Sequence, residues 1–282
     1  MPRSHPEAIS PTAHYTGMVW LQNGLSHPAF ATLRGQALYY GLKAPLAALK
    51  LLGAPTVDGF LLARHRLIDQ ELEAAIESGR ISQVIEIASG LSPRGWRFCE
   101  RYGDRITYIE ADLPDMAECK RQLLRDGGLD SEHHQIRDIN ALLDDGPDSL
   151  KALVRELDPA RGLVIITEGL INYFDSETVL GMWRRFAGAL AGFSEGLYLS
   201  DLFLDMNNGG AAKQIFQALL STFVRGRVHL LFDSETQACE ELLHAGFDQA
   251  RLLDPHDYRT SIPDCRRAGA ETVRVVMART GV

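Results

Sequence analysis

The chain has 282 residues, of which 45% are hydrophobic and 23% charged, an ordinary composition for a soluble globular protein. Its formal net charge of −8 argues against a nucleic-acid partner, for which a basic face is expected. No apolar run approaches the ~18 residues of a membrane span, and the N-terminus leads into no apolar signal segment. We therefore expect a cytoplasmic protein with no membrane partner.

Residues 1–79 show helical patterns at 30–42, 45–52 and 60–77, separated by proline and glycine breaks. They lack strand patterns, so we predict a helical cap or lid that belongs to the same domain as the rest. This part is also basic, because residues 1–66 carry six Lys/Arg and two acids. Such a segment either focuses an anionic substrate or simply forms solvated helix faces.

From residue 80 onward, short apolar runs alternate with helical stretches, which predicts βαβ units and a parallel sheet with helices on both faces. The predicted strands are 82–87, 106–111, 131–140, 162–167 and 196–203, and the predicted helices are 94–102, 115–125, 149–157 and 176–191.

The pattern breaks at Asn207-Asn208-Gly209-Gly210, where an inserted helical segment is expected at about 205–233. A helix at 234–245 and a strand pair at 247–253 and 272–279 follow. Residues 80–282 thus predict an α/β core with a seven-stranded, mostly parallel sheet closed by an antiparallel pair.

The first functional signal is the turn Glu86-Ile-Ala88-Ser-Gly90, placed between a strand and a helix. Small residues let the backbone approach a ligand there, and the helix N-terminus offers free N–H groups. Ala88 stands where the first glycine of G-x-G-x-x-G would be. Alone, this turn is equally typical of an ordinary strand-to-helix connection.

The second signal is Asp112, at the end of the second strand and 22 residues beyond Gly90. An acid at this place accepts hydrogen bonds from ribose hydroxyls. Glu110 is the alternative, since it lies two residues back on the same side of the strand. Either acid could instead cap the helix that follows.

The third and fourth signals close later strands. Asp138, followed by Ile139, could accept a hydrogen bond from an adenine amino group while Ile139 packs on the ring. Glu168, followed by Gly169, places an acid at the carboxyl edge of the sheet, where open α/β folds bind ligands. A carboxylate there could fix the ammonium group of a sulfonium methyl donor in line with its acceptor.

In wording and order, 86–95, 108–114 with Lys120, 137–139 and 167–173 resemble the leucine carboxyl methyltransferase family. That family includes bacterial O-methyltransferases of polyketide biosynthesis, and the resemblance covers roughly residues 60–200. It implies a class I methyltransferase fold with S-adenosyl-L-methionine as cofactor and an activity in class EC 2.1.1.-.

Carried over by position, the resemblance makes Arg64 of Leu62-Ala-Arg64-His-Arg66 the ligand of the donor's carboxylate, near the acceptor, with Arg66 as the alternative. The cofactor contacts that it implies are Arg64, Glu86, Ala88, Gly90, Asp112, Leu113, Asp138, Ile139, Glu168 and Gly169. The family usually has a glycine at Ala88 and Asp-Thr-Arg at 92–94, where this chain has Ser-Pro-Arg.

We expect the acceptor to be a small, natural-product-like molecule that is methylated on a carboxylate or a hydroxyl group. A carboxylate needs no base, whereas an alcohol or phenol does. Base candidates by position are His14, Tyr15, Asp201 and His229. We take Arg64, Tyr15 and His14 as the catalytic candidates. Because no convincing His/Glu constellation is present, an anionic carboxylate acceptor is favoured.

Two other functions stay open: a regulator that binds S-adenosylmethionine without turnover, and an NAD(P)-dependent dehydrogenase. The latter lacks a complete G-x-G-x-x-G and a Tyr-x-x-x-Lys pair. No metal site is expected, since the four cysteines are scattered without a C-x-x-C pair. Whether the chain forms a homodimer also stays open.

Overall fold

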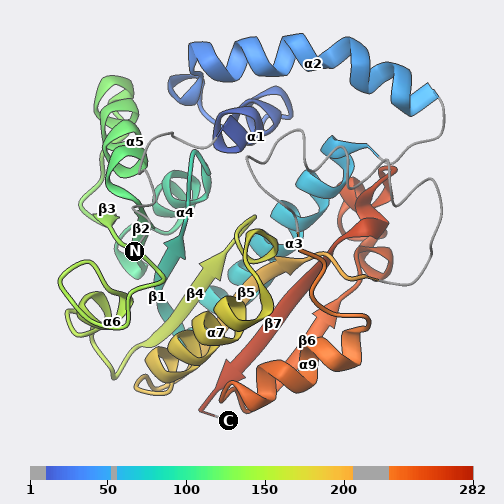
Figure 1. Cartoon of the computed structure of the whole chain (residues 1–282). Coiled ribbons are helices and arrows are strands. Elements are labelled where there is room, and N and C mark those ends of the chain that lie inside the picture. The colour runs from blue at the N-terminus through green and yellow to red at the C-terminus, as the bar shows by residue number, and fades with distance from the viewer. Residues whose placement is uncertain (1–10, 52–55, 206–228, 282) are drawn as a thin grey trace, which may run out of the picture.

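The computed structural model describes residues 11–51, 56–205 and 229–281. Its centre is a seven-stranded sheet with the strand order β3-β2-β1-β4-β5-β7-β6 (Figure 1). The strands are β1 (Ile81–Ile87), β2 (Thr107–Asp112), β3 (His134–Asp138), β4 (Gly162–Thr167), β5 (Gly196–Leu202), β6 (Gln249–Leu253) and β7 (Arg274–Thr280). Strands β1 to β5 pair in parallel, and β7 runs antiparallel between β5 and β6. The predicted mostly parallel α/β sheet is confirmed.

The central strands are apolar without alternation because helices cover both of their faces. All six residues of β4 are buried, and β1 and β4 are neighbours in the middle of the sheet. Strand order reverses between these two, so the chain leaves β1 toward one edge and β4 toward the other. Their carboxyl ends therefore form the switch point at which open α/β sheets bind ligands.

Two apolar cores lie on opposite faces of the sheet. On one face α6 (Leu150–Val154), α7 (Ser176–Leu190) and α9 (Glu235–His244) pack around Trp183, which is fully buried. On the other face α3 (Val57–Glu77) and α4 (Arg94–Tyr102) cover the sheet. In Figure 1, α7 and α9 lie in front of the strands and α3 behind them. Helix α5 (Pro114–Gly127) packs against β3 at the sheet edge.

Helix α1 (Pro11–Gln22) is an element that the sequence patterns did not predict. It lies above the carboxyl ends of the parallel strands, with α2 (Leu33–Leu51) outside it (Figure 1). All residues from His14 to Trp20 are buried, so α1 has no polar face and no periodic apolar stripe to announce a helix.

Helix α2 corrects the predicted boundary before Pro45, because it runs through that residue without a break. Pro45 is exposed, so the hydrogen bond that its ring removes lies on the solvent side of the helix. The predicted insertion at 205–233 lies mostly outside the described residues. Within the described ranges, no helix is long and apolar enough to cross a bilayer.

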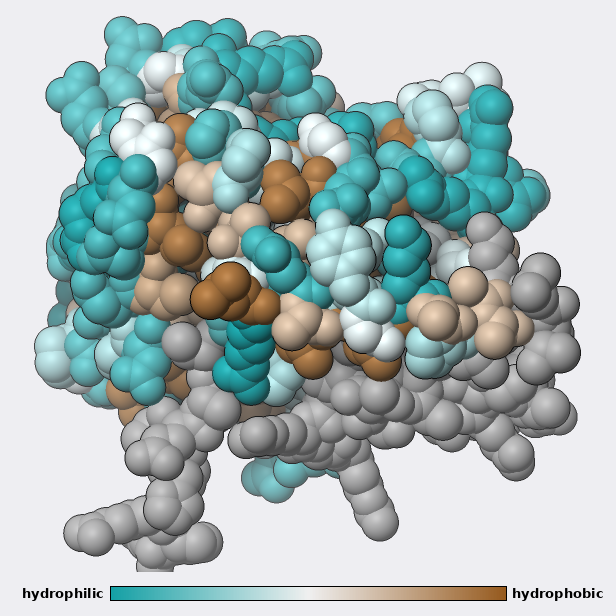
Figure 2. Space-filling model, turned by 90° about the horizontal axis from the view of Figure 1, so that it is seen from above, coloured by the Kyte–Doolittle hydropathy of each residue, from teal (hydrophilic) through white to brown (hydrophobic). Residues whose placement is uncertain are grey.

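Seen from above, the face over the sheet is mixed, with apolar residues gathered near its middle and hydrophilic ones around them (Figure 2). In α2, Leu33 is 87% and Tyr40 54% exposed. Isolated apolar side chains of this kind are common on soluble proteins.

A buried ion cluster ties β2 to its surroundings. Glu110 Oε2 lies 2.6 Å from Lys120 Nζ and 3.2 Å from His134 Nε2, both at ion-pair distance without hydrogen-bond alignment. Its Oε1 accepts a hydrogen bond from the backbone N–H of Gly95 at 3.2 Å. His134 lies in β3, within the predicted strand 131–140, and its side chain is only 1% exposed. The cluster thus links β2, β3 and α5 in the interior.

Replacing Gly95 tests how tightly this cluster is packed. A Cβ at Gly95 would lie 2.6 Å from Glu110 Oε1 and 2.5 Å from His134 Nε2. We expect Gly95→Ala to lower the free energy of unfolding by about 1–3 kcal/mol through overpacking. The matched control is Gly188→Ala in α7, where nothing lies within 4 Å and a gain of about 0.5–1 kcal/mol is expected. Urea denaturation measures both, and a Gly95→Ala protein as stable as the parent would contradict the packing described.

Candidate functional site

The candidate site lies where β1, β2, β4 and β5 end. The turn after β1 contains two residues in the left-handed region, Ala88 with φ of 54° and Gly90 with φ of 51°. Gly90 donates its N–H to Asp112 Oδ2 at 2.8 Å, and Leu113 donates its N–H to Asp112 Oδ1, also at 2.8 Å. The carboxylate of Asp112 thus joins the glycine turn to the end of β2.

Asp112 and Glu110 were alternatives for the same role, and the structure separates them. Glu110 is fully buried within its cluster with Lys120 and His134, so a ligand has no access to it. Asp112 is half-buried beside Leu113, which is 52% exposed. Burial raises the pKa of Asp112, while its two backbone N–H bonds oppose that shift. Of the two acids, Asp112 is the one placed to meet a ligand.

The N-terminus of α4 already holds an anion of the protein itself. The backbone N–H of Arg94 donates to Ser92 Oγ at 3.3 Å, and that of Gly95 donates to Glu110. Free N–H groups at a helix N-terminus would otherwise attract a phosphate. Since Glu110 fills this position, the turn after β1 is poorly suited to a pyrophosphate.

Asp138 and Ile139 follow β3, next to Asp112. Asp138 is paired with Asp112 in the sheet register and forms an ion pair with Arg121, while its side chain remains 40% exposed. The N–H of Ile139 donates to the Asp112 carbonyl at 2.9 Å, so this N–H is already used. A ligand could still contact the side chain of Ile139.

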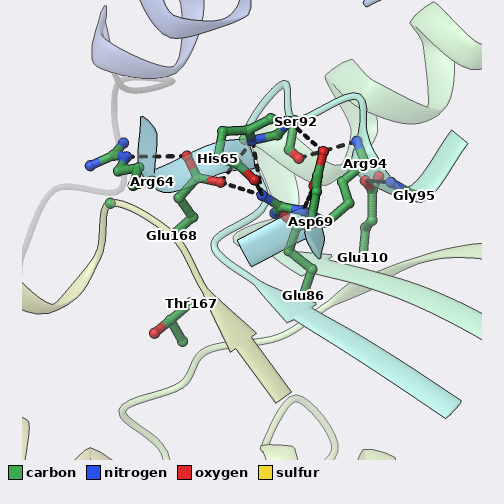
Figure 3. A network of polar contacts seen from close by, with 12 residues as sticks. Arg64, His65, Asp69, Glu86, Ser92, Arg94, Gly95, Glu110, Thr167 and Glu168 are labelled. Atoms are coloured by element: carbon green, nitrogen blue, oxygen red, sulfur yellow. Dashed lines mark hydrogen bonds and ion pairs between the residues drawn. The ribbon is translucent and has the colours of Figure 1, made fainter. Parts of the chain in front are cut away.

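Arg94 of α4 is the centre of a buried polar network that reaches α3, β1 and the end of β4 (Figure 3). Its side chain is fully buried and donates to Asp69 at 2.7 Å, to Glu86 at 2.6 Å and to Glu168 at 2.6 Å. The second oxygen of Glu86 accepts a hydrogen bond from Tyr108 Oη at 2.6 Å. Both oxygens of Glu86 are thus bound inside the protein, which makes it a support of the site.

Glu168 lies between Arg64 and Arg94, as Figure 3 shows. Its Oε1 accepts from Arg64 Nε at 3.1 Å, and its Oε2 lies 2.6 Å from Arg94 Nη2 and 2.9 Å from His65 Nδ1. Burial alone would raise the pKa of Glu168, but the neighbouring positive groups outweigh burial and hold that pKa well below its ordinary value. Glu168 is therefore ionised at neutral pH.

Two further ion pairs extend this network to β5 and to Arg97 of α4. Arg64 also donates from Nη1 to Asp201 Oδ2 at 2.6 Å, and Arg97 pairs with Asp69 at 2.8 Å. Four carboxylates thereby face three guanidinium groups, with His65 enclosed among them. The carboxylates belong to Asp69, Glu86, Glu168 and Asp201, and the guanidinium groups to Arg64, Arg94 and Arg97.

A pocket opens beside this network. Its polar end is formed by Arg64, Gly169 and Asp201, and α1 supplies part of its wall. The described residues that line it are Thr12, Tyr15, Thr16, Val57, Phe60, Leu61, Arg64, Gly169, Leu170, Asn172, Tyr173, Asp201 and Phe203. The pocket therefore joins one charged end to largely apolar walls.

The catalytic candidates are placed differently. Arg64 and Tyr15 line the pocket. Arg66, the alternative to Arg64, is half-exposed, and its Nε lies 3.5 Å from Asp264 Oδ2. His14 is not among the described lining residues, and its Nδ1 lies 2.8 Å from Thr32 Oγ1. Burial lowers the pKa of His14. The contacts support Arg64 and Tyr15 as pocket residues, and a role for His14 stays a prediction without a pocket contact.

Sequence patterns did not single out the inner part of the network. Arg94 was noted only as one residue of a short string, and His65 and Asp69 were not considered as site residues. The signal that could have found them is the spacing of His65 and Asp69, which places both on one face of α3. Their partner Arg94 comes from another helix, and no local pattern predicts that contact.

Comparison with known proteins agrees with the fold and with the motifs. The family model of leucine carboxyl methyltransferase matches residues 34–187. A protein of Rhodococcus jostii named as an S-adenosyl-L-methionine-dependent methyltransferase is 31% identical over 156 residues, covering 55% of this chain and 50% of its own length. A Parafrankia protein with the same description is 34% identical over 153 residues, covering 53% and 46%. The chain thus spans about half the length of these curated relatives.

Solved structures show the fold. A methyltransferase structure from Thermobifida fusca has a TM-score of 0.61 at 14% identity and covers 100% of this chain and 99% of its own. A structure from Streptomyces avermitilis, described as a DUF574 family protein, has a TM-score of 0.64 at 12% identity, covering 95% and 97%. The predicted class I methyltransferase fold is confirmed.

Ala88 offers a test of the turn geometry. Among the described residues it is the one non-glycine residue with positive φ, a conformation that costs an L-residue roughly 1–2 kcal/mol. We expect Ala88→Gly to keep the free energy of unfolding or raise it by up to about 1 kcal/mol. The control Ala189→Gly, within α7, should lose about 1 kcal/mol. Equal losses in the two variants, measured by urea denaturation, would show that Ala88 is not strained.

Proposed function

Because the chain belongs to the leucine carboxyl methyltransferase family, we propose that it transfers a methyl group from S-adenosylmethionine to an oxygen atom of a small molecule. The observation that carries this proposal is a pair of carboxylates at the carboxyl ends of β2 and β4, where open α/β sheets bind ligands. Asp112 is fixed by two backbone N–H groups, and Glu168 is ionised. S-adenosylmethionine has ribose hydroxyls that suit the first acid and an ammonium group that suits the second.

The nucleoside half of the donor would lie along the ends of β2 and β3. Asp112 is fixed by Gly90 and Leu113 and would accept hydrogen bonds from the ribose hydroxyls. Asp138 would accept from the adenine amino group. The exposed side chain of Leu113 and the buried side chain of Ile139 would contact the adenine ring.

The amino-acid half would lie over Gly90 and against Glu168 and Arg64. Glu168 is ionised and would bind the ammonium group. Arg64 uses Nε and Nη1 for Glu168 and Asp201, and no other described residue bonds its Nη2. This atom lies beside Gly169, where a Cβ would come within 2.9 Å of it. The Nη2 group would donate to the donor's carboxylate, and Gly169 would keep the space that it needs.

When bound, the donor supplies an electrophilic methyl group on a positively charged sulfur. The chain's own residues would orient it and exclude water from the reacting atoms. Helix α1 contributes to this enclosure, since a Cβ at Gly90 would lie 3.1 Å from the Ala13 side chain. We propose that α1 and α2 act as the cap of the site, and that a natural-product-like acceptor enters the pocket below α1.

The structure offers little to a dinucleotide. In a dehydrogenase of this topology the pyrophosphate lies at the N-terminus of the first crossover helix. Here Glu110 accepts the N–H of Gly95 at that place. A pyrophosphate at this helix N-terminus would lie against the buried carboxylate of Glu110. The repulsion between the two anions disfavours NAD(P).

Calorimetry with three ligands tests the donor assignment. We expect S-adenosylmethionine and its demethylated product to bind with micromolar dissociation constants, and NAD(P) to give no signal. Screening small phenols and carboxylic acids with labelled donor should then yield a methylated product. Tight NAD(P) binding without a response to S-adenosylmethionine would overturn the proposal, and donor binding without turnover on any acceptor would favour a regulator.

Asp112→Ala tests the ribose contact. Loss of a hydrogen-bonded charge should weaken binding of the demethylated product by about 1.5–3 kcal/mol, or roughly 10- to 150-fold. The matched control is Asp115→Ala, an exposed acid in the first turn of α5, which should bind within twofold of the parent. Glu110 has no access to a ligand and could not replace Asp112. Unchanged affinity in Asp112→Ala would therefore show that neither acid binds the ribose.

A further inference from the structure

Asp201 is a buried pocket residue whose position the network fixes. It lies near the end of β5 and is 2% exposed, yet it lines the pocket. Its Oδ1 accepts the N–H of Gly169 at 2.6 Å, and its Oδ2 accepts Arg64 Nη1 at 2.6 Å. A carboxylate offers about four acceptor positions, so these two bonds orient the group and leave it able to accept another.

The described cation at this end of the pocket is already shared by two carboxylates. Arg64 pairs with both Asp201 and Glu168. In the proposed complex, Arg64 Nη2 would also hold the donor's carboxylate. A carboxylate acceptor would then lie beside Asp201 with no described lining cation of its own, which is costly in a buried site.

Other described lining residues cannot supply the missing positive charge. Burial raises the pKa of both Tyr15 and Tyr173, so these phenols stay neutral. The amide of Asn172 donates to the carbonyls of Phe203 and His229 and accepts from the Phe203 N–H. An uncharged acceptor group is therefore the better match to the pocket.

The walls suit an apolar body on that acceptor. The apolar lining includes the aliphatic side chains of Val57, Leu61 and Leu170. It also includes Phe60 and Phe203, whose rings pack edge to face with their centroids 5.3 Å apart. Aromatic and aliphatic walls with a few polar groups at one end are typical of sites for small apolar molecules. One polar group at the Asp201 end and one apolar body would satisfy both parts of the pocket.

From these contacts we propose that the pocket selects a neutral hydroxyl, on an apolar or aromatic body, as the methyl acceptor, and that Asp201 takes its proton. The inference rests on the proposed function. In the step, the hydroxyl oxygen forms a bond to the donor's methyl carbon while the carbon–sulfur bond breaks. The electron pair of that bond stays on sulfur, and the hydroxyl proton moves to Asp201.

Burial of Asp201 supports its use as a base. It raises the pKa of Asp201, while the Arg64 charge and the Gly169 N–H oppose the shift. A carboxylate with a raised pKa holds a proton better, which matches it more closely to a weakly acidic phenol. The proton thus has a defined destination within hydrogen-bond reach of the pocket.

Binding of two matched probes tests the proposal. The protein is first saturated with sinefungin, a stable cationic analogue of the donor, and then titrated with 2-naphthol or 2-naphthoate in a calorimeter. We expect the parent protein to bind 2-naphthol at least tenfold more tightly than 2-naphthoate. In Asp201→Asn, naphthol binding should weaken and naphthoate binding should tighten at least tenfold, because the repelling charge is gone.

Two controls separate the possible failures. Glu177→Gln removes an exposed carboxylate of α7 and should leave both probe affinities within twofold. Sinefungin is titrated into Asp201→Asn first, so that the variant and the parent are both saturated when the probes are compared. A parent protein that prefers naphthoate, binds neither probe, or keeps its preference in Asp201→Asn overturns the acceptor assignment alone. Failure of the parent to bind sinefungin would instead overturn the proposed function.

Discussion

The ion pairs of Arg94 hold together the parts of the molecule from which the site is built. One fully buried guanidinium group connects Asp69 of α3, Glu86 of β1 and Glu168 at the end of β4. Removing one partner of a buried ion pair typically costs 3–5 kcal/mol, because a charge is then left without compensation. The position of Glu168, and through it that of Arg64, therefore depends on a residue that does not line the pocket.

Acids that look alike in the sequence have different environments at the same edge of the sheet. Glu110 and Asp112 are two residues apart on β2, but Glu110 is enclosed by Lys120 and His134 while Asp112 lies at the strand end. Glu168 and Asp201 share Arg64, and they face the donor side and the acceptor side of it in the proposed reaction. Depth below the sheet edge thus decides which carboxylate supports the fold and which meets a ligand.

The sequence predicts the strands well because buried parallel strands are continuous apolar runs, and the helix at 94–102 has the predicted bounds. It does not predict α1, which is buried on all sides, or the passage of α2 through Pro45. At the site, acids at strand ends are visible as a pattern, since each follows an apolar run. The partners of Arg94 and the walls of the pocket are not visible as a sequence pattern. They come from α1, α3, α4 and β5, which lie far apart in the chain.

The most direct test is a crystal structure of the protein with S-adenosylhomocysteine bound. We expect the ribose hydroxyls to contact Asp112, the ammonium group to contact Glu168, and the sulfur to face the pocket lined by Arg64 and Asp201. A ligand bound elsewhere, or one that leaves both Asp112 and Glu168 without contact, would contradict this arrangement.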